Sequence, residues 1–129
     1  LKAANAGKPV DVIVDPVGGE ATEPAFRSLA WNGRHLVIGF AGGSIPRLPV
    51  NLALLKGASL IGVDVRQFGD YEHALAEANV QALLALFAQG KLYPPIARTY
   101  PIDDFVAAME EAQRGVTAGR IVITMAAPQ

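Results

Sequence analysis

The sequence predicts an α/β fold built around a doubly wound parallel sheet. Two short apolar runs, at Val10–Asp15 and at residues 35–38, each lead into a turn rich in glycine, and a stretch with helical spacing separates them. Strands joined by helices run parallel, and such sheets bind ligands outside the carboxyl ends of their strands. The chain contains no glycine-rich phosphate loop. The two turns are therefore typical of the second half of a dinucleotide site.

Composition and charge restrict the classes of protein to which the chain can belong. Its 129 residues suit one domain, and the 51% hydrophobic and 18% charged residues argue against disorder. No apolar stretch reaches the roughly 18 residues of a membrane span. The 11 basic and 12 acidic side chains, without a basic run, exclude nucleic acid as a partner. Cysteine is absent and no signal segment opens the chain, so we expect a cytoplasmic protein without disulfides or sulfur-based zinc sites.

The first part of the chain is expected to alternate strands and helices. Val10–Asp15 is rich in β-branched residues and is predicted to be a central strand, covered by helices on both faces. A helix is expected from a cap at Thr22, with Pro24 in its first turn, to a stop at Gly33. Residues 34–38 are predicted to form the second strand.

A loop with several glycines and prolines, residues 40–49, follows the second strand. A short helix is expected next, at residues 52–56, capped by Asn51 and ended by Gly57. Residues 58–65 are predicted to form a third strand. Three strands with helical connections favour a right-handed doubly wound arrangement.

The pattern changes after the longest predicted helix, which is expected to begin at a cap on Asp70 and to end at Gly90. Residues 91–101 are expected to be extended. An amphipathic helix capped by Asp103 should follow, and residues 120–125 should close the chain as an apolar strand. We therefore place a boundary near Gly90.

The turn after the first strand holds the first candidate site. Asp15 lies at the carboxyl end of that strand, where its carboxylate could contact a ribose hydroxyl or accept hydrogen bonds from the N–H groups of its own turn. Gly18 and Gly19 could serve a positive φ or let a ligand approach the backbone. The sequence leaves both alternatives open.

The segment after the second strand, residues 38–43, holds the second candidate site. Because its side chains are mostly small, its backbone N–H and C=O groups could pair with a planar amide such as nicotinamide, with Phe40 beside the ring. A mobile surface loop is the alternative.

The remaining polar residues give weaker signals. His35 and His73 have no metal-ligand partner at helical spacing and are expected to face solvent. None of the three serines lies in a G-x-S-x-G elbow, which argues against nucleophilic hydrolysis. The pair Glu110 and Glu111 is expected on a solvated helix face. Arg114, near a predicted helix end, could pair with a phosphate or with the helix dipole.

Five blocks of residues, in this order and spacing, resemble the medium-chain dehydrogenase/reductase superfamily, which is the zinc-type alcohol dehydrogenase superfamily, and within it the quinone oxidoreductase-like members. The resemblance covers nearly the whole chain. The blocks are residues 15–19, residues 39–43 followed by 45–47, residues 51–57, residues 90–92 and residues 117–123.

This resemblance implies a fold and an activity. Residues 1–90 would be the C-terminal half of an NAD(P)-binding Rossmann domain, and residues 91–129 a segment returning to the catalytic, substrate-binding domain. The implied enzyme uses NADPH to transfer hydride to a quinone or an enone. The chain alone should be incompetent, because the phosphate-binding turn and most of the substrate domain would precede it. The resemblance also implies a homodimer joined through a sheet edge near the third strand.

The resemblance carries cofactor-binding roles to particular positions. These are Pro16, Val17 and Gly18 beside the nicotinamide ribose, Ile38, Gly39, Phe40 and Ala41 at the nicotinamide, and Arg114 as a late cofactor contact. The loop after Arg114 is one residue longer than usual, and Asp64-Val65-Arg66 stand where relatives often carry aromatic residues. No residue of this chain is expected to act as a catalytic group or a metal ligand.

Three alternatives to the quinone oxidoreductase remain. The chain could be a portion of a zinc-type alcohol dehydrogenase or of an enoyl reductase, which the region before it would decide. It could be a non-catalytic dimerisation module. A receiver-like signalling domain is a third alternative, although Asp15 lacks the acidic neighbours that receiver chemistry needs.

Overall fold

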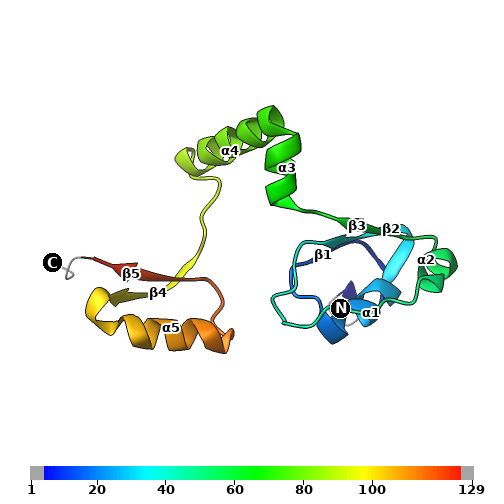
Figure 1. The fold of residues 1–129 in the computed structure, drawn as a ribbon, viewed down its shortest axis with the longest axis horizontal. Helices are drawn as coiled ribbons and strands as arrows, with labels where there is room; N and C mark the ends of the chain where they lie inside the picture. The colour runs from blue at the N-terminus through cyan, green and yellow to red at the C-terminus, as the bar shows by residue number, and fades with distance from the viewer. Residues whose placement is uncertain (1–4, 126–129) are drawn as a thin grey trace. The chain divides into compact units, whose positions relative to one another are not determined.

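The computed structural model describes residues 5–125, which form two compact units that divide between His73 and Ala74. Both units combine helices with parallel strands, so the predicted α/β class is confirmed (Figure 1). Within the described part of the chain, no helix is both long and apolar enough to cross a membrane. The predicted assignment of residues 1–90 and 91–129 to a cofactor domain and a substrate domain stays a prediction.

The first unit is built on a three-stranded parallel sheet in the order β1-β2-β3. The strands are β1 (Val10–Asp15), β2 (Leu29–Val37) and β3 (Ser59–Gly62). The bounds of β1 are those predicted. In the register, Ile13 lies opposite His35, and the last residue of β1 lies opposite the last residue of β2. All three carboxyl ends therefore meet at one edge of the sheet.

Two helices cover one face of this sheet. Helix α1 (Thr22–Arg27) follows the short η2 (Gly19–Ala21), and α2 (Asn51–Lys56) leads into β3. One buried cluster holds the helices to the sheet, and it comprises Phe26, Leu29 and Leu52. The small core explains why these short helices are stable, since helices of this length gain little stability from propensity alone.

The opposite face of β1 is not covered by any described residue. Side chains alternate across a strand, and Val12 and Val14 point away from the helices with 41% and 63% of their surface exposed. The prediction of a central strand covered on both faces is therefore wrong for the described chain, in which β1 is an edge strand.

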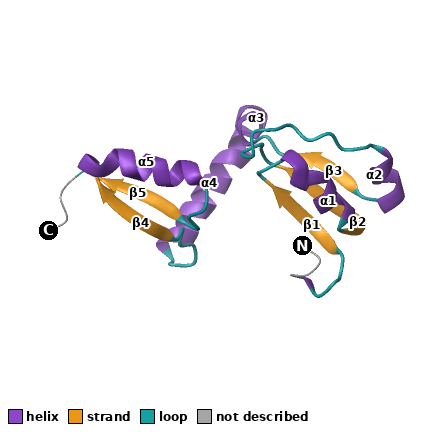
Figure 2. Cartoon of the chain, turned by 90° about the horizontal axis from the view of Figure 1, so that it is seen from below, coloured by secondary structure: helices purple, strands orange, loops and turns teal. Residues whose placement is uncertain are grey.

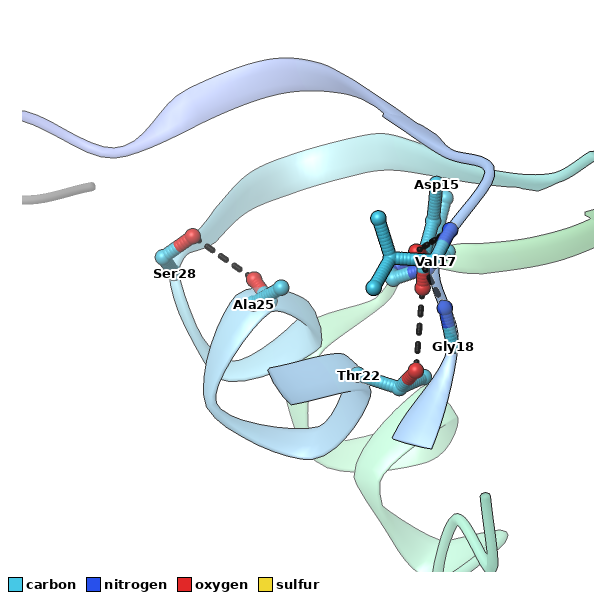
Figure 3. A network of polar contacts seen from close by, with 7 residues as sticks. Asp15, Val17, Gly18, Thr22, Ala25 and Ser28 are labelled. Atoms are coloured by element: carbon cyan, nitrogen blue, oxygen red, sulfur yellow. Dashed lines mark hydrogen bonds and ion pairs between the residues drawn. The ribbon is translucent and has the colours of Figure 1, made fainter. Parts of the chain in front are cut away.

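The boundary between α1 and β2 differs from the predicted one. The helix expected to continue to Gly33 ends at Arg27, because Ser28 donates from both its N–H and its hydroxyl to the Ala25 carbonyl, at 2.9 and 2.6 Å (Figure 3). Leu29 then pairs with Val10, and the register is irregular before pairing resumes further along β2. The predicted second strand is thus the last part of a longer one.

Three predicted helix caps are replaced by other residues. Thr22 is the first residue of α1, with Ala21 at the cap position and no side-chain cap. Asn51 is the first residue of α2, with Val50 at the cap position and no side-chain cap. Asp70 lies inside α3 (Val65–Tyr71), and it is Asp64 whose carboxylate accepts from the first N–H groups of that helix. Because Asp64 starts a helix, β3 is shorter than the predicted residues 58–65. Gly57 does end α2 in the left-handed conformation, as predicted.

The second unit contains α4 (His73–Ala88), β4 (Ile96–Pro101), η3 (Ile102–Asp104), α5 (Phe105–Arg114) and β5 (Arg120–Thr124). Strands β4 and β5 pair in parallel, and α5 lies along one face of the pair (Figure 2). The predicted cap at Asp103 is wrong, because that residue belongs to η3 and Asp104 holds the cap position without a side-chain hydrogen bond. The closing strand is confirmed.

Candidate functional site

Asp15 organises the turn that follows β1 (Figure 3). Its Oδ1 accepts hydrogen bonds from the N–H groups of Val17 and Gly18, at 3.0 and 2.9 Å. Its Oδ2 accepts from the Thr22 hydroxyl at 2.9 Å and lies 3.0 Å from Nε2 of His35. Of the two roles left open by the sequence, the turn-anchoring one is confirmed.

These contacts hold the Asp15 side chain in its charged form. Burial raises the pKa of the carboxyl, but hydrogen bonds from Gly18, His35, Thr22 and Val17 outweigh that effect and lower the pKa from 3.8 to about 2. Asp15 is therefore ionised throughout the physiological range, and a fixed negative charge lies at the base of the turn.

His35 is fully buried, so the expectation that it faces solvent is wrong. Its position on β2 places it on the face covered by the helices, where its ring stacks on Phe26 with centroids 5.9 Å apart. The Asp15 carboxylate provides the polar partner that makes this burial possible. His73 is exposed, as expected.

Backbone hydrogen bonds join the turn after β1 to the segment after β2. In each of these bonds the N–H of the first residue donates to the carbonyl of the second: Ile38 to Asp15 at 2.9 Å, Ala41 to Pro16 at 3.0 Å, Gly42 to Val17 at 2.8 Å, and Gly19 to Ser44 at 3.1 Å. The second segment is thus tied to the first along its length. Within residues 5–125, the N–H of Phe40 has no acceptor.

The approach of a ligand to Gly18 stays a prediction, whereas the structure confirms the other explanation, a positive φ at this residue. Its φ is +70°, a conformation that glycine adopts without strain, and so is the φ of +68° at Gly19. A Cβ on Gly18 would also lie 2.8 Å from Cδ1 of Phe40. Close approach and backbone conformation therefore both require glycine at this position.

An open crevice of about 720 Å³ lies at the carboxyl ends of β2 and β3 and at the start of α3. It is lined by residues 37–40 and 62–67. The predicted Ile38, Gly39 and Phe40 thus share a wall of one crevice, whereas Ala41 is not part of its lining. Ile38 and Gly39 of that wall donate to the Asp15 carbonyl, and Pro16 and Val17 accept from Ala41 and Gly42, just beyond the wall.

The charged groups of the crevice neutralise one another. The Asp64 carboxylate accepts from the N–H groups of Arg66 and Gln67, and it lies 3.8 Å from the Arg66 guanidinium. The N–H of Gln67 is the main cause of the lowered pKa of Asp64. Apart from the uncharged amide of Gln67, the other lining side chains are apolar, so the crevice suits an uncharged ring better than an anion.

Arg114 differs from the other predicted site residues, because it lies in the second unit as the last residue of α5. One turn earlier, Glu111 is buried, which contradicts its expected place on a solvated face. Its carboxylate accepts from the hydroxyl of Tyr100, from the hydroxyl of Thr117 at 2.7 Å and from Arg98 at 3.1 Å. The sequence spacing could have indicated this burial, because Glu111 follows the buried Ala108 by three residues and shares its helix face.

The family model for zinc-binding dehydrogenases matches residues 2–123. The chain belongs to this family. A curated relative, the mouse quinone oxidoreductase-like protein 2, is 32% identical over 127 residues, which cover 96% of this chain and 35% of the relative. The chain spans about a third of the length of the curated relatives it matches.

Solved structures show the same fold. A probable oxidoreductase from Mycobacterium abscessus is 35% identical with a TM-score of 0.68, and the match covers 95% of this chain and 35% of that one. A mycobacterial protein solved with NADPH has a TM-score of 0.72 at 19% identity, covering 95% and 38%. The resemblance to quinone oxidoreductase-like medium-chain dehydrogenases is therefore confirmed.

The zinc-binding dehydrogenase family takes its name from a metal. Among the residues that the structure describes, no group of three or more His, Cys, Asp or Glu side chains could hold one. The described residues therefore do not form a zinc site.

Proposed function

We propose that this chain forms the nicotinamide-binding part of an NADPH-dependent oxidoreductase that transfers hydride to a quinone or an enone. The observation that carries the proposal is the crevice at the strand ends, whose wall at Ile38, Gly39 and Phe40 belongs to a segment that is hydrogen-bonded to the end of β1 and to the turn after it. The NADPH complex of the mycobacterial neighbour and the name of the mouse relative support the choice of cofactor and acceptor.

The residues of the chain would orient the cofactor rather than react. The N–H of Phe40, which has no acceptor among residues 5–125, is suited to the carboxamide oxygen of the nicotinamide, and the apolar side chains of Ile38 and Phe40 are suited to its ring. Pro16, Val17 and Gly18 would lie beside the ribose, and Arg114 would make a later contact. The bound nicotinamide would supply the hydride, and the crevice would contribute by holding it in position.

We also propose that the chain requires further residues for activity. It has no G-x-G-x-x-G turn to bind the pyrophosphate. A homodimer would form through β3, whose residues are all exposed and which lies at an edge of the described sheet. The expected cytoplasmic location stays a prediction.

The test uses reduced nicotinamide mononucleotide, which contains only the half of NADPH that this crevice would bind. In ¹H–¹⁵N spectra of the 129-residue chain, it should shift the amides of residues 17, 18 and 38–41 and leave α2 unchanged. Adenosine 2′,5′-bisphosphate, which represents the other half, is the matched control and should shift none of them. Wild-type spectra that do not respond to the reduced mononucleotide would contradict the proposal.

If the chain is instead a non-catalytic dimerisation module, we expect a different pair of results. Sedimentation equilibrium would then show a stable dimer, and the spectra would show no response to the mononucleotide. A dimer together with shifts confined to the crevice supports the oxidoreductase.

A further inference from the structure

Asp15 is in contact with both segments that form the proposed cofactor site. Its carboxylate accepts from the N–H groups of Val17 and Gly18 in the first segment. Its main-chain carbonyl accepts from the N–H of Ile38 at 2.9 Å and of Gly39 at 3.4 Å in the second. The carboxylate of Asp15 thus holds the first segment and its main chain holds the second, so a displacement of the whole residue would move both.

The Asp15 side chain is itself held in place from the opposite side. Oδ2 is occupied by the Thr22 hydroxyl and by Nε2 of His35, and only 11% of the side chain is exposed. Both carboxylate oxygens thus have two partners inside the protein. Carboxylate oxygens have about two lone-pair sites each, so Asp15 has no free site for a ligand.

The tautomer of His35 follows from this arrangement. An ionised carboxylate only accepts hydrogen bonds, so Nε2 must carry the proton that faces Asp15. The other ring nitrogen, Nδ1, is buried without a partner among the described residues. Moving the proton to Nδ1 would bury an unsatisfied N–H and turn the Nε2 lone pair toward a negative charge. The neutral His35 ring therefore has a single favourable tautomer.

We propose that Asp15 is the positioning residue of the cofactor site, which touches no ligand and fixes the two ligand-binding segments relative to each other, with Thr22 and His35 locking its carboxylate. This inference rests on the proposed function for the identity of the ligand. The arrangement resembles a second layer of support around a binding site, in which the groups that orient the contacting residues matter as much as the contacts.

The substitution that tests the inference is Asp15→Asn. The amide keeps one acceptor oxygen, but its NH₂ group must now face Thr22 and His35, so His35 can keep a hydrogen bond only by moving its proton to Nδ1. Long-range ¹H–¹⁵N correlation should report that change of tautomer. The loss of charge-assisted bonds should lower hydrogen-exchange protection of the Val17 and Gly18 amides by about tenfold. Binding of reduced nicotinamide mononucleotide should weaken by about the same factor.

Three further variants make the result specific. Asp11→Asn is the matched control, because Asp11 lies on the same strand and no hydrogen bond of its side chain occurs among the described residues; it should change neither protection nor binding. Thr22→Val removes one hydrogen bond to Oδ2 and should reduce amide protection and binding by less than Asp15→Asn does. It replaces Asp15→Asn as the test if that variant does not fold. Thr22→Ser retains the hydroxyl and should restore binding to the wild-type level.

The two hypotheses fail in different ways. Amide protection is measured without ligand, so an Asp15→Asn chain whose Val17 and Gly18 amides stay protected would overturn the positioning role alone. A wild-type chain that does not respond to the mononucleotide would overturn the proposed function alone. A ligand-induced shift of the Asp15 carboxyl carbon, with normal amide protection in Asp15→Asn, would show direct contact and also overturn the inference.

Discussion

The ring of Phe40 lies directly against Gly18, so that a Cβ at Gly18 would be 2.8 Å from Cδ1 of the ring. This contact joins the two glycine segments through a side chain, in addition to the backbone bonds that run between them. Gly18 also has a φ of +70° and a ψ of −149°, a combination that is nearly restricted to glycine. The position of the Phe40 ring therefore depends on the absence of a side chain at residue 18.

The substitution Gly18→Ala should displace the Phe40 ring and weaken mononucleotide binding. The backbone strain alone should reduce the free energy of unfolding by about 1–3 kcal/mol, and the clash adds to it. Chemical unfolding measures the first effect, and the aromatic signals of Phe40 report the second.

Gly43→Ala is the matched control for the effect of strain. Gly43 has a φ of +86°, but no heavy atom lies within 4 Å of a Cβ placed on it. It should lose stability for the same conformational reason and leave the Phe40 signals and ligand binding unchanged. Equal effects of the two substitutions on the Phe40 ring would contradict the argument.

The Asp15 carboxyl should titrate far below its ordinary range. Its pKa is lowered from 3.8 to about 2, so the stabilisation it provides is complete above the unfolded pKa and is lost as the pH falls through the folded pKa. The loss should amount to about 2 kcal/mol between about pH 4 and pH 2. Titration of the carboxyl carbon signal by NMR gives the folded pKa directly, and a midpoint near 3.8 would count against the hydrogen-bonded geometry.

The core of the first unit is small, so a single truncation should have a large effect. Leu52 on α2 is 4% exposed and packs in the cluster with Phe26 and Leu29, whereas Leu54 on the same helix is 81% exposed. Leu52→Ala should reduce the free energy of unfolding by about 2–5 kcal/mol. Leu54→Ala should change it by less than about 0.5 kcal/mol. Urea unfolding followed by circular dichroism compares the two, and similar midpoints would contradict this core assignment.

The sequence predicted the elements whose pattern is local. Strand β1 and the left-handed end of α2 at Gly57 follow from β-branched residues and from glycine, and both are as predicted. The start of β2 was not predictable in the same way. Leu29 has helical spacing from Phe26, but pairing with Val10 places it in the sheet, and tertiary pairing overrides local spacing.

The burial of the polar side chains could not be predicted without knowing their partners, which lie far away in the sequence. His35 is buried with the carboxylate of Asp15, twenty residues earlier and on the neighbouring strand, as its polar partner at 3.0 Å. Glu111 is buried because Arg98 and Tyr100 on β4 face it. Single-sequence reasoning places such residues on the surface, since charged and imidazole groups are seldom fully buried without a partner. The partner is a property of the fold.

Tyr100 and Glu111 give the last prediction, which concerns the second unit. The Tyr100 hydroxyl donates to the Glu111 carboxylate and is the main cause of its lowered pKa, followed by Thr117, with Arg98 and Arg114 contributing through their charge against the opposing effect of burial. Because the folded pKa lies below the ordinary value, the network stabilises the unit above that value and loses its effect as the pH falls.

Tyr100→Phe should therefore lower the thermal midpoint of the second unit by several degrees at neutral pH, since a buried carboxylate loses a charge-assisted donor. The difference from wild type should shrink in acid, where Glu111 is protonated in both. Tyr93→Phe is the matched control, because Tyr93 is exposed and its hydroxyl has no hydrogen-bond partner among the described residues. Hydrogen exchange of the β4 and β5 amides measures the stability of the second unit separately from that of the first. A difference that persists unchanged in acid would mean that Tyr100 stabilises the unit by packing, not through Glu111.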